Sequence, residues 1–191
     1  AVKGIRNQNE LAQESSEISD FWSMLQGFQT SGKCIEKAHY RIRYMKSFRP
    51  LSVKEDIEFK EARPILYLNT AAVASLFNSR NAGSTSNRSN WSTIMSYLKS
   101  HTSYLGLKQD RFTILLPSGL PDYTIDIVNG EQVKKVKVNR PKALCFDYLQ
   151  LKETFGLDLE TEVVAENQEE IPAESNVIDL QQLKQNELPF E

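Results

Sequence analysis

The segment from residue 27 to residue 34 nearly matches the phosphate-binding loop pattern GxxxxGK[ST], in which backbone N–H groups and a lysine hold nucleotide phosphates. That chemistry needs a strand before the loop and a helix after it. The apolar spacing instead predicts a helix before Gly27 and a strand after Cys34, and Cys34 replaces the hydroxyl that would hold Mg²⁺. We therefore expect no ATP hydrolysis here, and nucleotide binding through residues 27–33 is the third of three hypotheses.

Metal and nucleophile chemistry have no signature in this sequence. The only histidines, His39 and His101, have no Cys or carboxylate at ligand spacing. No nucleophile motif with a partnered base is present. We therefore expect no enzyme activity, metal, cofactor or small-molecule substrate for this chain. The two cysteines, Cys34 and Cys145, lie far apart and form no disulfide framework, which favours a reducing cytoplasm.

Charge divides the chain into two parts. Residues 1–159 hold 22 Lys and Arg against 16 Asp and Glu, whereas residues 160–191 hold 1 against 9. The body therefore carries a net charge of +6 and the tail −8. This division indicates a surface for polyanions and a separate interaction tail. The alternative is a solvated surface with a solubilising tail.

Hydrophobic periodicity predicts one α+β domain over residues 17–159, between a polar linker (1–16) and an acidic flexible tail (160–191). No apolar run is long enough to span a bilayer, and residues 1–16 have no signal-peptide pattern. Asn129 and Gly130 give the strongest hairpin signal. The predicted elements, in order, are helix 18–28, strands 39–45, 57–59 and 65–68, helix 70–80 with Thr70 as its cap, helix 89–104, strands 111–116, 123–128, 132–138 and 143–146, and a helix from the cap Asp147 to the stop Gly156.

The order helix, strand, helix, helix, hairpin is the plan of a winged-helix-like DNA-binding domain. In that plan residues 89–104 form the recognition helix and the 123–138 hairpin forms the wing. The residues expected to contact phosphates or base edges are Arg88, Asn90, Lys99, Lys134, Lys135, Lys137, Arg140 and Lys142. The alternative is that the lysines only protect an edge strand from aggregation.

Four stretches, residues 65–68, 89–100, 104–106 and 143–148, resemble the C-terminal region of large primase–helicase-type replication proteins of bacterial phages and mobile elements. Residues 18–22 and 39–44 fit the same region, so the resemblance spans about residues 18–159 and rests on hydrophobic pattern rather than a catalytic signature. It implies a non-catalytic accessory region for DNA or subunit contact, with ATPase or primase chemistry upstream. A chain that begins with Ala1 instead of Met agrees with a fragment.

The tail is similar to two replication peptides. Gln185, Leu188 and Phe190 resemble the bacterial sliding-clamp-binding motif, although Asn186 stands where that motif usually has Leu. Residues 187–190 also resemble the tip of bacterial single-stranded-DNA-binding proteins, but Glu191 follows Phe190 and removes the terminal Phe carboxylate. Two main hypotheses result. The chain is a DNA-binding accessory domain, for single- or double-stranded DNA, or an adaptor that docks a helicase body or sliding clamp without DNA contact.

Overall fold

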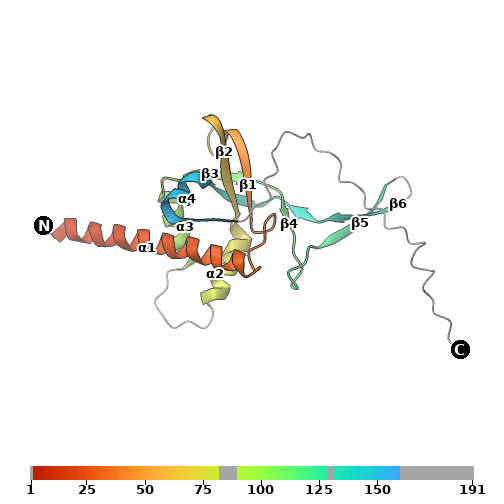
Figure 1. The fold of residues 1–191 in the computed structure, drawn as a ribbon, viewed down its shortest axis with the longest axis horizontal. Coiled ribbons are helices and arrows are strands. Elements are labelled where there is room, and N and C mark those ends of the chain that lie inside the picture. Colours follow the sequence, from red (N-terminus) through yellow and green to blue (C-terminus); the bar gives the residue numbers. More distant parts are fainter. Residues whose placement is uncertain (1, 82–89, 129–130, 160–191) are drawn as a thin grey trace.

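The structure, a computed structural model, describes residues 2–81, 90–128 and 131–159, with the side chains of residues 2–10 and 81 left aside (Figure 1). The described elements are α1 (Val2–Thr30), β1 (Tyr40–Phe48), β2 (Ile57–Asn69), α2 (Thr70–Asn81), α3 (Trp91–Ser100), β3 (Tyr104–Gln109), β4 (Phe112–Thr113), β5 (Tyr123–Val128), β6 (Glu131–Val136), β7 (Val138–Asn139), β8 (Lys142–Asp147) and α4 (Tyr148–Phe155).

The body of the protein is built on an antiparallel sheet with the strand order β1-β2-β8-β3. β8 occupies an inner position because its side chains from Ala143 to Phe146 are apolar without interruption and can be buried on both faces. This strand brings the C-terminal part of the domain between two segments that precede it by about 40 and 80 residues, so the sheet forms only when distant parts of the chain meet.

Helices cover one face of the sheet and form the larger core with it. The centre of this core is Trp22 of α1, whose ring meets Phe146 of β8 edge-on at a centroid distance of 5.2 Å. Ile94 and Leu98 of α3 and Leu151 of α4 are buried in the same cluster. The apolar stripe of each helix therefore faces the sheet, which accounts for the spacing of hydrophobic residues in the sequence.

The opposite face of the sheet carries a smaller apolar cluster. Phe48, Tyr67 and Phe112 are buried there together with Cys145. The segment that follows β1 lies close to β3 at this face, since Leu51 N donates to the carbonyl oxygen of Leu107 at 2.8 Å. This face is therefore covered by loops and strand ends rather than by helices.

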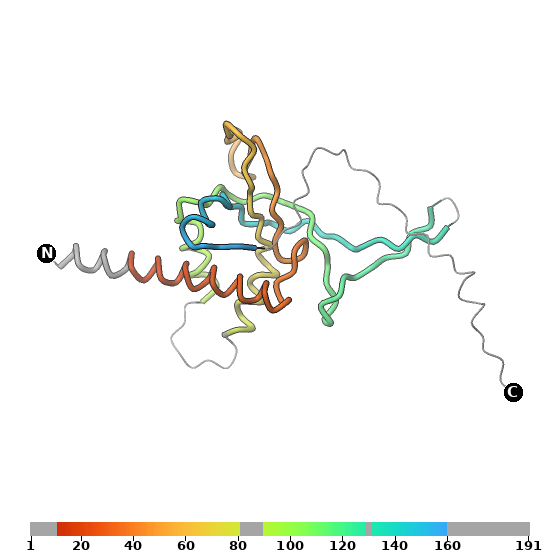
Figure 2. The backbone as a smooth tube through the Cα atoms, viewed as in Figure 1, coloured from red at the N-terminus to blue at the C-terminus, as the bar shows by residue number. Residues whose placement is uncertain are grey.

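A two-stranded arm extends from the body (Figures 1 and 2). We use "the arm" for the described residues of 112–139. The pairing of β4 with β7 forms its root, and the pairing of β5 with β6 forms its outer part. The predicted hairpin is thus present in strands β5 and β6, while its turn at Asn129 and Gly130 lies outside the described residues.

The α+β class expected from the sequence is confirmed, with helices on one face of an antiparallel sheet. The winged-helix arrangement stays a prediction: α2 and α3 are consecutive as that plan requires, but the hairpin belongs to the projecting arm and does not join the main sheet. None of the helices in the described ranges is long and apolar enough to cross a membrane.

Several element boundaries differ from the predictions for identifiable reasons. Residues 2–16, expected as a linker, belong to α1. The strands predicted at 57–59 and 65–68 are one strand, β2, because Pro64 lies where β2 is flanked by β1 alone and its missing N–H breaks no bond to β8. The helix predicted to reach Tyr104 ends at Ser100, and Tyr104 begins β3. The strand predicted at 111–116 is reduced to β4.

Helix caps follow the sequence at two of three positions. Asp147 accepts from the backbone N–H of Gln150 at the start of α4, and Gly156 ends that helix in the left-handed conformation, both as expected. Thr70 is not the cap of α2. The buried Asn69 accepts from the N–H of Ala72 instead, and the Thr70 hydroxyl donates to the carbonyl oxygen of Lys142 at 2.9 Å.

Candidate nucleic-acid interface

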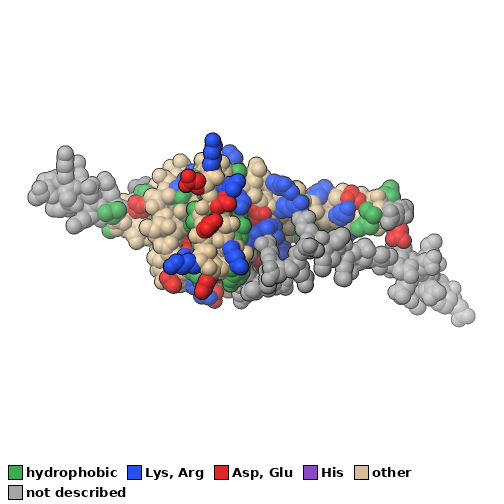
Figure 3. Space-filling model, turned by 90° about the horizontal axis from the view of Figure 1, so that it is seen from above, with side chains coloured by type: hydrophobic (Ala, Val, Ile, Leu, Met, Phe, Trp, Pro, Cys, Tyr) green, Lys and Arg blue, Asp and Glu red, His purple; other side chains and the backbone are tan. Residues whose placement is uncertain are grey.

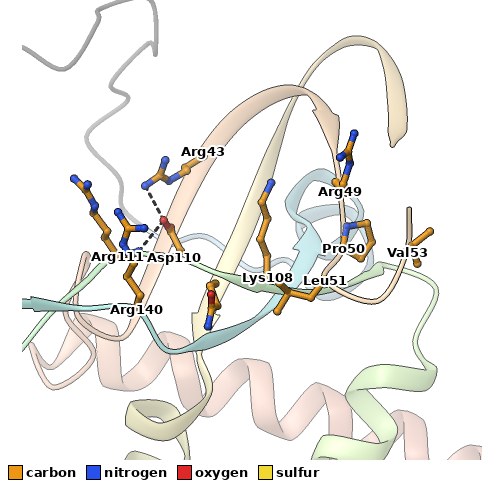
Figure 4. Close-up of a pocket in the computed structure, with 10 residues that line it drawn as sticks. Arg43, Arg49, Pro50, Leu51, Val53, Lys108, Asp110, Arg111 and Arg140 are labelled. Carbon is orange, nitrogen blue, oxygen red and sulfur yellow. Dashed lines mark hydrogen bonds and ion pairs between the residues drawn. The ribbon is translucent and has the colours of Figure 1, made fainter. Parts of the chain in front are cut away.

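Five cationic side chains line one pocket where the arm leaves the body (Figure 4). The pocket has a volume of about 640 Å³ and opens to solvent. We call it the basic pocket. Its cations come from separate parts of the chain. β1 contributes Arg43, the segment after β1 contributes Arg49, and β3 contributes Lys108. The residues next to the two ends of the arm contribute Arg111 and Arg140.

Asp110 fixes one end of the basic pocket. Its Oδ1 accepts from Arg43 Nη2 at 2.9 Å and from the backbone N–H of Arg111 at 2.8 Å. Arg41 lies on the same side, and its Nη1 donates to the carbonyl oxygen of Arg111 at 2.9 Å. Because the Asp110 side chain is only 11% exposed, water screens these contacts less than it screens surface ion pairs. Asp110 therefore holds the arginines in place.

A cation–π contact holds the cation in the middle of the pocket, and an ion pair holds the cation at its far wall. Lys108 lies over the Phe48 ring with its Nζ 5.1 Å from the ring centroid. Arg49 is paired with Asp56, and this hydrogen bond lowers the pKa of the Asp56 carboxyl. Figure 4 shows Arg43, Arg111 and Arg140 around Asp110 at one end, Arg49 at the other end, and Lys108 between them.

Gly106 allows the segment after β1, which forms one wall of the basic pocket, to approach β3. Its φ of +132° is unfavourable for any residue with a Cβ. A Cβ built on Gly106 would lie 2.7 Å from Pro50 Cβ. Pro50, Leu51 and Val53 form the apolar part of the pocket lining. Glycine is therefore required here to bring that segment, and Arg49 with it, against the sheet.

The charges in the basic pocket do not cancel. One carboxylate, Asp110, lines it against five cations, and a second, Asp56, pairs with Arg49 from outside the lining. Arg140 is exposed, and among the described residues no carboxylate lies within 4.0 Å of its side chain or of Lys108. Guanidinium groups bind phosphate oxygens with two parallel hydrogen bonds, and several of them in one concave site favour a polyanion.

The lysines predicted on the wing are engaged within the arm. Lys135 pairs with Asp126 at 3.0 Å and Lys137 with Asp122 at 2.9 Å. The Nζ of Lys134 lies 4.1 Å from the centroid of the Tyr123 ring. These interactions are exposed and weak enough to be exchanged for a ligand. They nevertheless make the wing less positive than its lysine content indicates.

The other residues predicted to contact DNA do not lie together in the structure. Arg140 lines the basic pocket, and Lys142 stands opposite Gln109, which lines it too. Asn90 caps α3 by accepting from the N–H of Thr93 at 2.9 Å, and Lys99 lies in the last turn of the same helix. Because α3 packs on the helix-covered face, these two lie on the other side of the sheet from the pocket. Arg88 and the tail residues Gln185, Leu188 and Phe190 lie outside the described residues.

Four cations of the pocket were not among the predicted contacts. Arg43 had a signal, since Arg41 and Arg43 alternate with apolar residues in the predicted strand 39–45 and therefore share its outer face. Arg49, Lys108 and Arg111 have no such pattern. Their positions depend on which strands become neighbours, and Lys108 lines one pocket with Arg43 only after β3 has joined β8.

The segment 27–34, which nearly matches a phosphate-binding loop, lies between a helix and a strand, as its flanking sequence predicted. α1 includes its first four residues and ends at Thr30, and the next element is the strand β1. The Nζ of Lys33 is 5.9 Å from the centroid of the Phe28 ring, and burial raises the pKa of the Cys34 thiol to about 12. No helix N-terminus follows to receive a phosphate. Among the described residues there is also no cluster of three His, Cys, Asp or Glu that could hold a metal.

Figure 3 shows Lys and Arg side chains gathered on the body and where the arm begins, with hydrophobic side chains near the outer part of the arm. The molecule thus presents a basic region at the root of the arm and an apolar region farther out. Comparison with known proteins finds no matching family model, no similar curated protein and no similar solved structure.

Proposed function

We propose that this chain is a non-catalytic domain that binds nucleic acid, with the basic pocket as its principal phosphate contact. The observation that carries the proposal is the convergence of five cations on one pocket that contains a single carboxylate. A ligand with closely spaced negative charges releases counterions on binding there, which is the main source of affinity in nucleic-acid complexes.

A polymer fits the charge distribution better than a small anion. The positive region continues from the pocket to Lys142, and the arm adds Lys134 beyond it. Contacts of this kind go to phosphates and fix the position of the strand, while they carry little sequence information. We therefore propose binding with weak sequence preference. Whether single or double strands bind more tightly is decided by the experiment below.

The resemblance to primase–helicase-type replication proteins gives this proposal its biological setting. In that setting the chain acts in the cytoplasm as an accessory region, and the ATPase or primase chemistry belongs to another region. The winged-helix comparison adds the arm as a wing beside the nucleic acid, and the acidic segment from residue 160 onward, which lies outside the described residues, would link the domain to a partner. Its last residues supply a contact for a sliding clamp.

The test is fluorescence anisotropy with labelled single-stranded and duplex DNA at low and moderate salt, using the full chain. Replacing both Lys108 and Arg140 by Ala removes two cations that have no carboxylate partner among the described residues. We expect this double variant to bind at least about tenfold more weakly, because hydrogen bonds to charged groups contribute roughly 1.5 kcal/mol or more. The slope of log K against log salt should fall by about 1.4 for single strands.

The matched control is the double replacement of Lys135 and Lys137 by Ala, which removes the same amount of charge from ion pairs within the arm. A general electrostatic effect would weaken binding equally in both variants. A contact at the pocket makes the Lys108/Arg140 variant clearly weaker. Equal losses would therefore reject the pocket as the principal contact.

The adaptor hypothesis predicts a different result. If the unaltered chain binds neither form of DNA at low salt, the proposal of nucleic-acid binding fails. Docking to a helicase body or a sliding clamp without DNA contact then becomes the better explanation.

A further inference from the structure

The outer part of the arm has an edge that no described residue pairs with. β5 is hydrogen-bonded to β6 alone within the described ranges, so the outer arm is a two-stranded sheet. On one of its faces the β5 residues are apolar and open to solvent, with Tyr123 41%, Ile125 65% and Ile127 76% exposed, whereas β6 contributes Val136, Lys134 and Gln132 to that face. Two strands are seldom stable alone in water, whereas three or more strands that share an apolar face can be.

The two edges of this small sheet differ in chemistry. β6 carries Lys134 and Lys135, and lysines on an edge strand oppose pairing with a further strand. β5 has no Lys or Arg, and most of its residues are β-branched or aromatic, types that favour strand pairing. Its one charged residue, Asp126, is already paired with Lys135 of the same arm. The edge available for a new strand is therefore that of β5.

The backbone of β5 is oriented for such pairing. At the inner end of the arm, Lys137 N donates to the carbonyl oxygen of Asp122 at 2.8 Å. Antiparallel ladders alternate along the strand, so the peptide groups of Thr124 and Asp126 point toward β6. Those of Tyr123, Ile125 and Ile127 then point to the open edge. A row of donors and acceptors accompanies the exposed apolar side chains.

We propose that a second copy of this chain adds its β5 antiparallel to this edge, so that the two arms form one four-stranded sheet. The sequence of β5 is self-complementary when the pairing is centred on Ile125. Ile125 then faces its own counterpart, Tyr123 faces Ile127, and Thr124 faces Asp126. A register centred on Asp126 would place two carboxylates opposite each other, which is unfavourable. The two-fold arrangement closes on itself and stops at a dimer.

Sedimentation equilibrium of the full chain tests the association. The expected species at micromolar concentration has twice the 21.8 kDa mass of the chain. Ile125→Pro removes a donor that points to the open edge rather than to β6, so it should give a monomer. Val136→Lys adds a charge to the β6 half of the face that carries Ile125, so the dimer should persist. If the arms instead packed face to face, Val136→Lys would break the dimer, and the edge pairing would be wrong.

Disulfide trapping tests the register without relying on a disruptive variant. Under the proposed register the two Ile125 Cα atoms lie about 5.5 Å apart, within disulfide reach. The two Asp126 Cα atoms lie about 8 Å apart, which is beyond that reach. Ile125→Cys should therefore form a linked dimer under mild oxidation, and the matched Asp126→Cys should not. The native Cys34 and Cys145 are buried and do not interfere.

Besides loss of the dimer in Val136→Lys, three results would overturn the proposal. One is a full chain that stays monomeric at micromolar concentration, and another is a dimer that Ile125→Pro leaves intact. The third is trapping of Asp126→Cys as efficient as that of Ile125→Cys, which would show that the paired strands slide or that a different surface is in contact.

Discussion

Gly106 provides the most direct test of how the basic pocket is built. Replacing it by Ala should lower the free energy of unfolding for two separate reasons. The φ of +132° is strained for any residue with a side chain, at about 1–3 kcal/mol. The new Cβ would also lie 2.7 Å from Pro50 Cβ, whereas carbon atoms in contact prefer roughly 3.5–4.0 Å. Pro50 must therefore retreat by about 1 Å, and such overpacking costs typically about 1–3 kcal/mol.

Together these terms predict a loss of roughly 2–6 kcal/mol in the free energy of unfolding, against a total of about 5–15 kcal/mol for a domain. The melting temperature of a domain near this size falls by roughly 2–4 °C for each kcal/mol. We therefore expect the melting temperature to decrease by roughly 4–24 °C, measured by calorimetry or by circular dichroism. Because Arg49 follows Pro50 when the wall retreats, DNA affinity should fall in the same variant.

Two other glycines separate the two costs. Gly119 has a φ of +81°, but a Cβ there meets nothing within 4 Å, so Gly119→Ala measures backbone strain alone. Gly27 lies within α1 with equally open surroundings, and Gly27→Ala should raise stability by about 0.5–1 kcal/mol. If Gly106→Ala costs no more than Gly119→Ala, the contact with Pro50 is not tight, and the account of the pocket wall is refuted.

Two further predictions concern buried titratable groups. Burial raises the pKa of the Cys34 thiol to about 12 and raises that of Cys145 as well, so neither thiol should react with a chromogenic disulfide at pH 8 until the protein is denatured, when both should react. Rapid labelling of the native chain would contradict the burial. Burial also lowers the pKa of His39, whose Nδ1 accepts from Ile35 N at 3.0 Å. Stability from this neutral histidine is complete above its ordinary pKa of about 6.5 and declines as pH falls below it, because the unfolded chain binds the proton more readily. His39→Asn keeps an acceptor without titrating, so its unfolding free energy should decrease less between pH 7 and pH 5, and an unchanged pH dependence would exclude His39 as a source.

Local sequence patterns were sufficient to predict those elements whose structure depends on a single short segment. The hairpin strands, the cap at Asp147 and the left-handed stop at Gly156 depend on short-range chemistry and were predicted. The central position of β8 also has a local signal, its uninterrupted apolar run. The predicted start of the first helix at residue 18 was wrong, because the polar composition of residues 2–16 hides a helix continuous with the buried stripe around Phe21 and Trp22.

The basic pocket could not be predicted from local patterns because it is a product of sheet topology. Arg43 and Lys108 are 65 residues apart in sequence. They line the same pocket because β2 and β8 lie between their strands and join β1 and β3 into one sheet. The lysines from 134 to 137 are close together in sequence and predicted a contact, yet in the structure Lys135 pairs with Asp126 and Lys137 with Asp122. Charge density along the sequence therefore identified a basic surface in general and missed where the cations converge.

The pocket and the arm share residues, which links the two proposals. Arg111 immediately precedes β4 and Arg140 immediately follows β7, so two of the five pocket cations adjoin the two ends of the arm. A dimer joined through β5 fixes the direction of both arms and thereby the separation of two pockets. A DNA strand long enough to reach both would bind more tightly than a short one, because its second contact is made at high effective concentration. The Ile125→Pro variant should therefore retain its affinity for a short oligonucleotide and lose the advantage of a longer one. If it also loses the short one, strand pairing and pocket geometry are not separate features, and the arm itself must position Arg111 and Arg140 for phosphate.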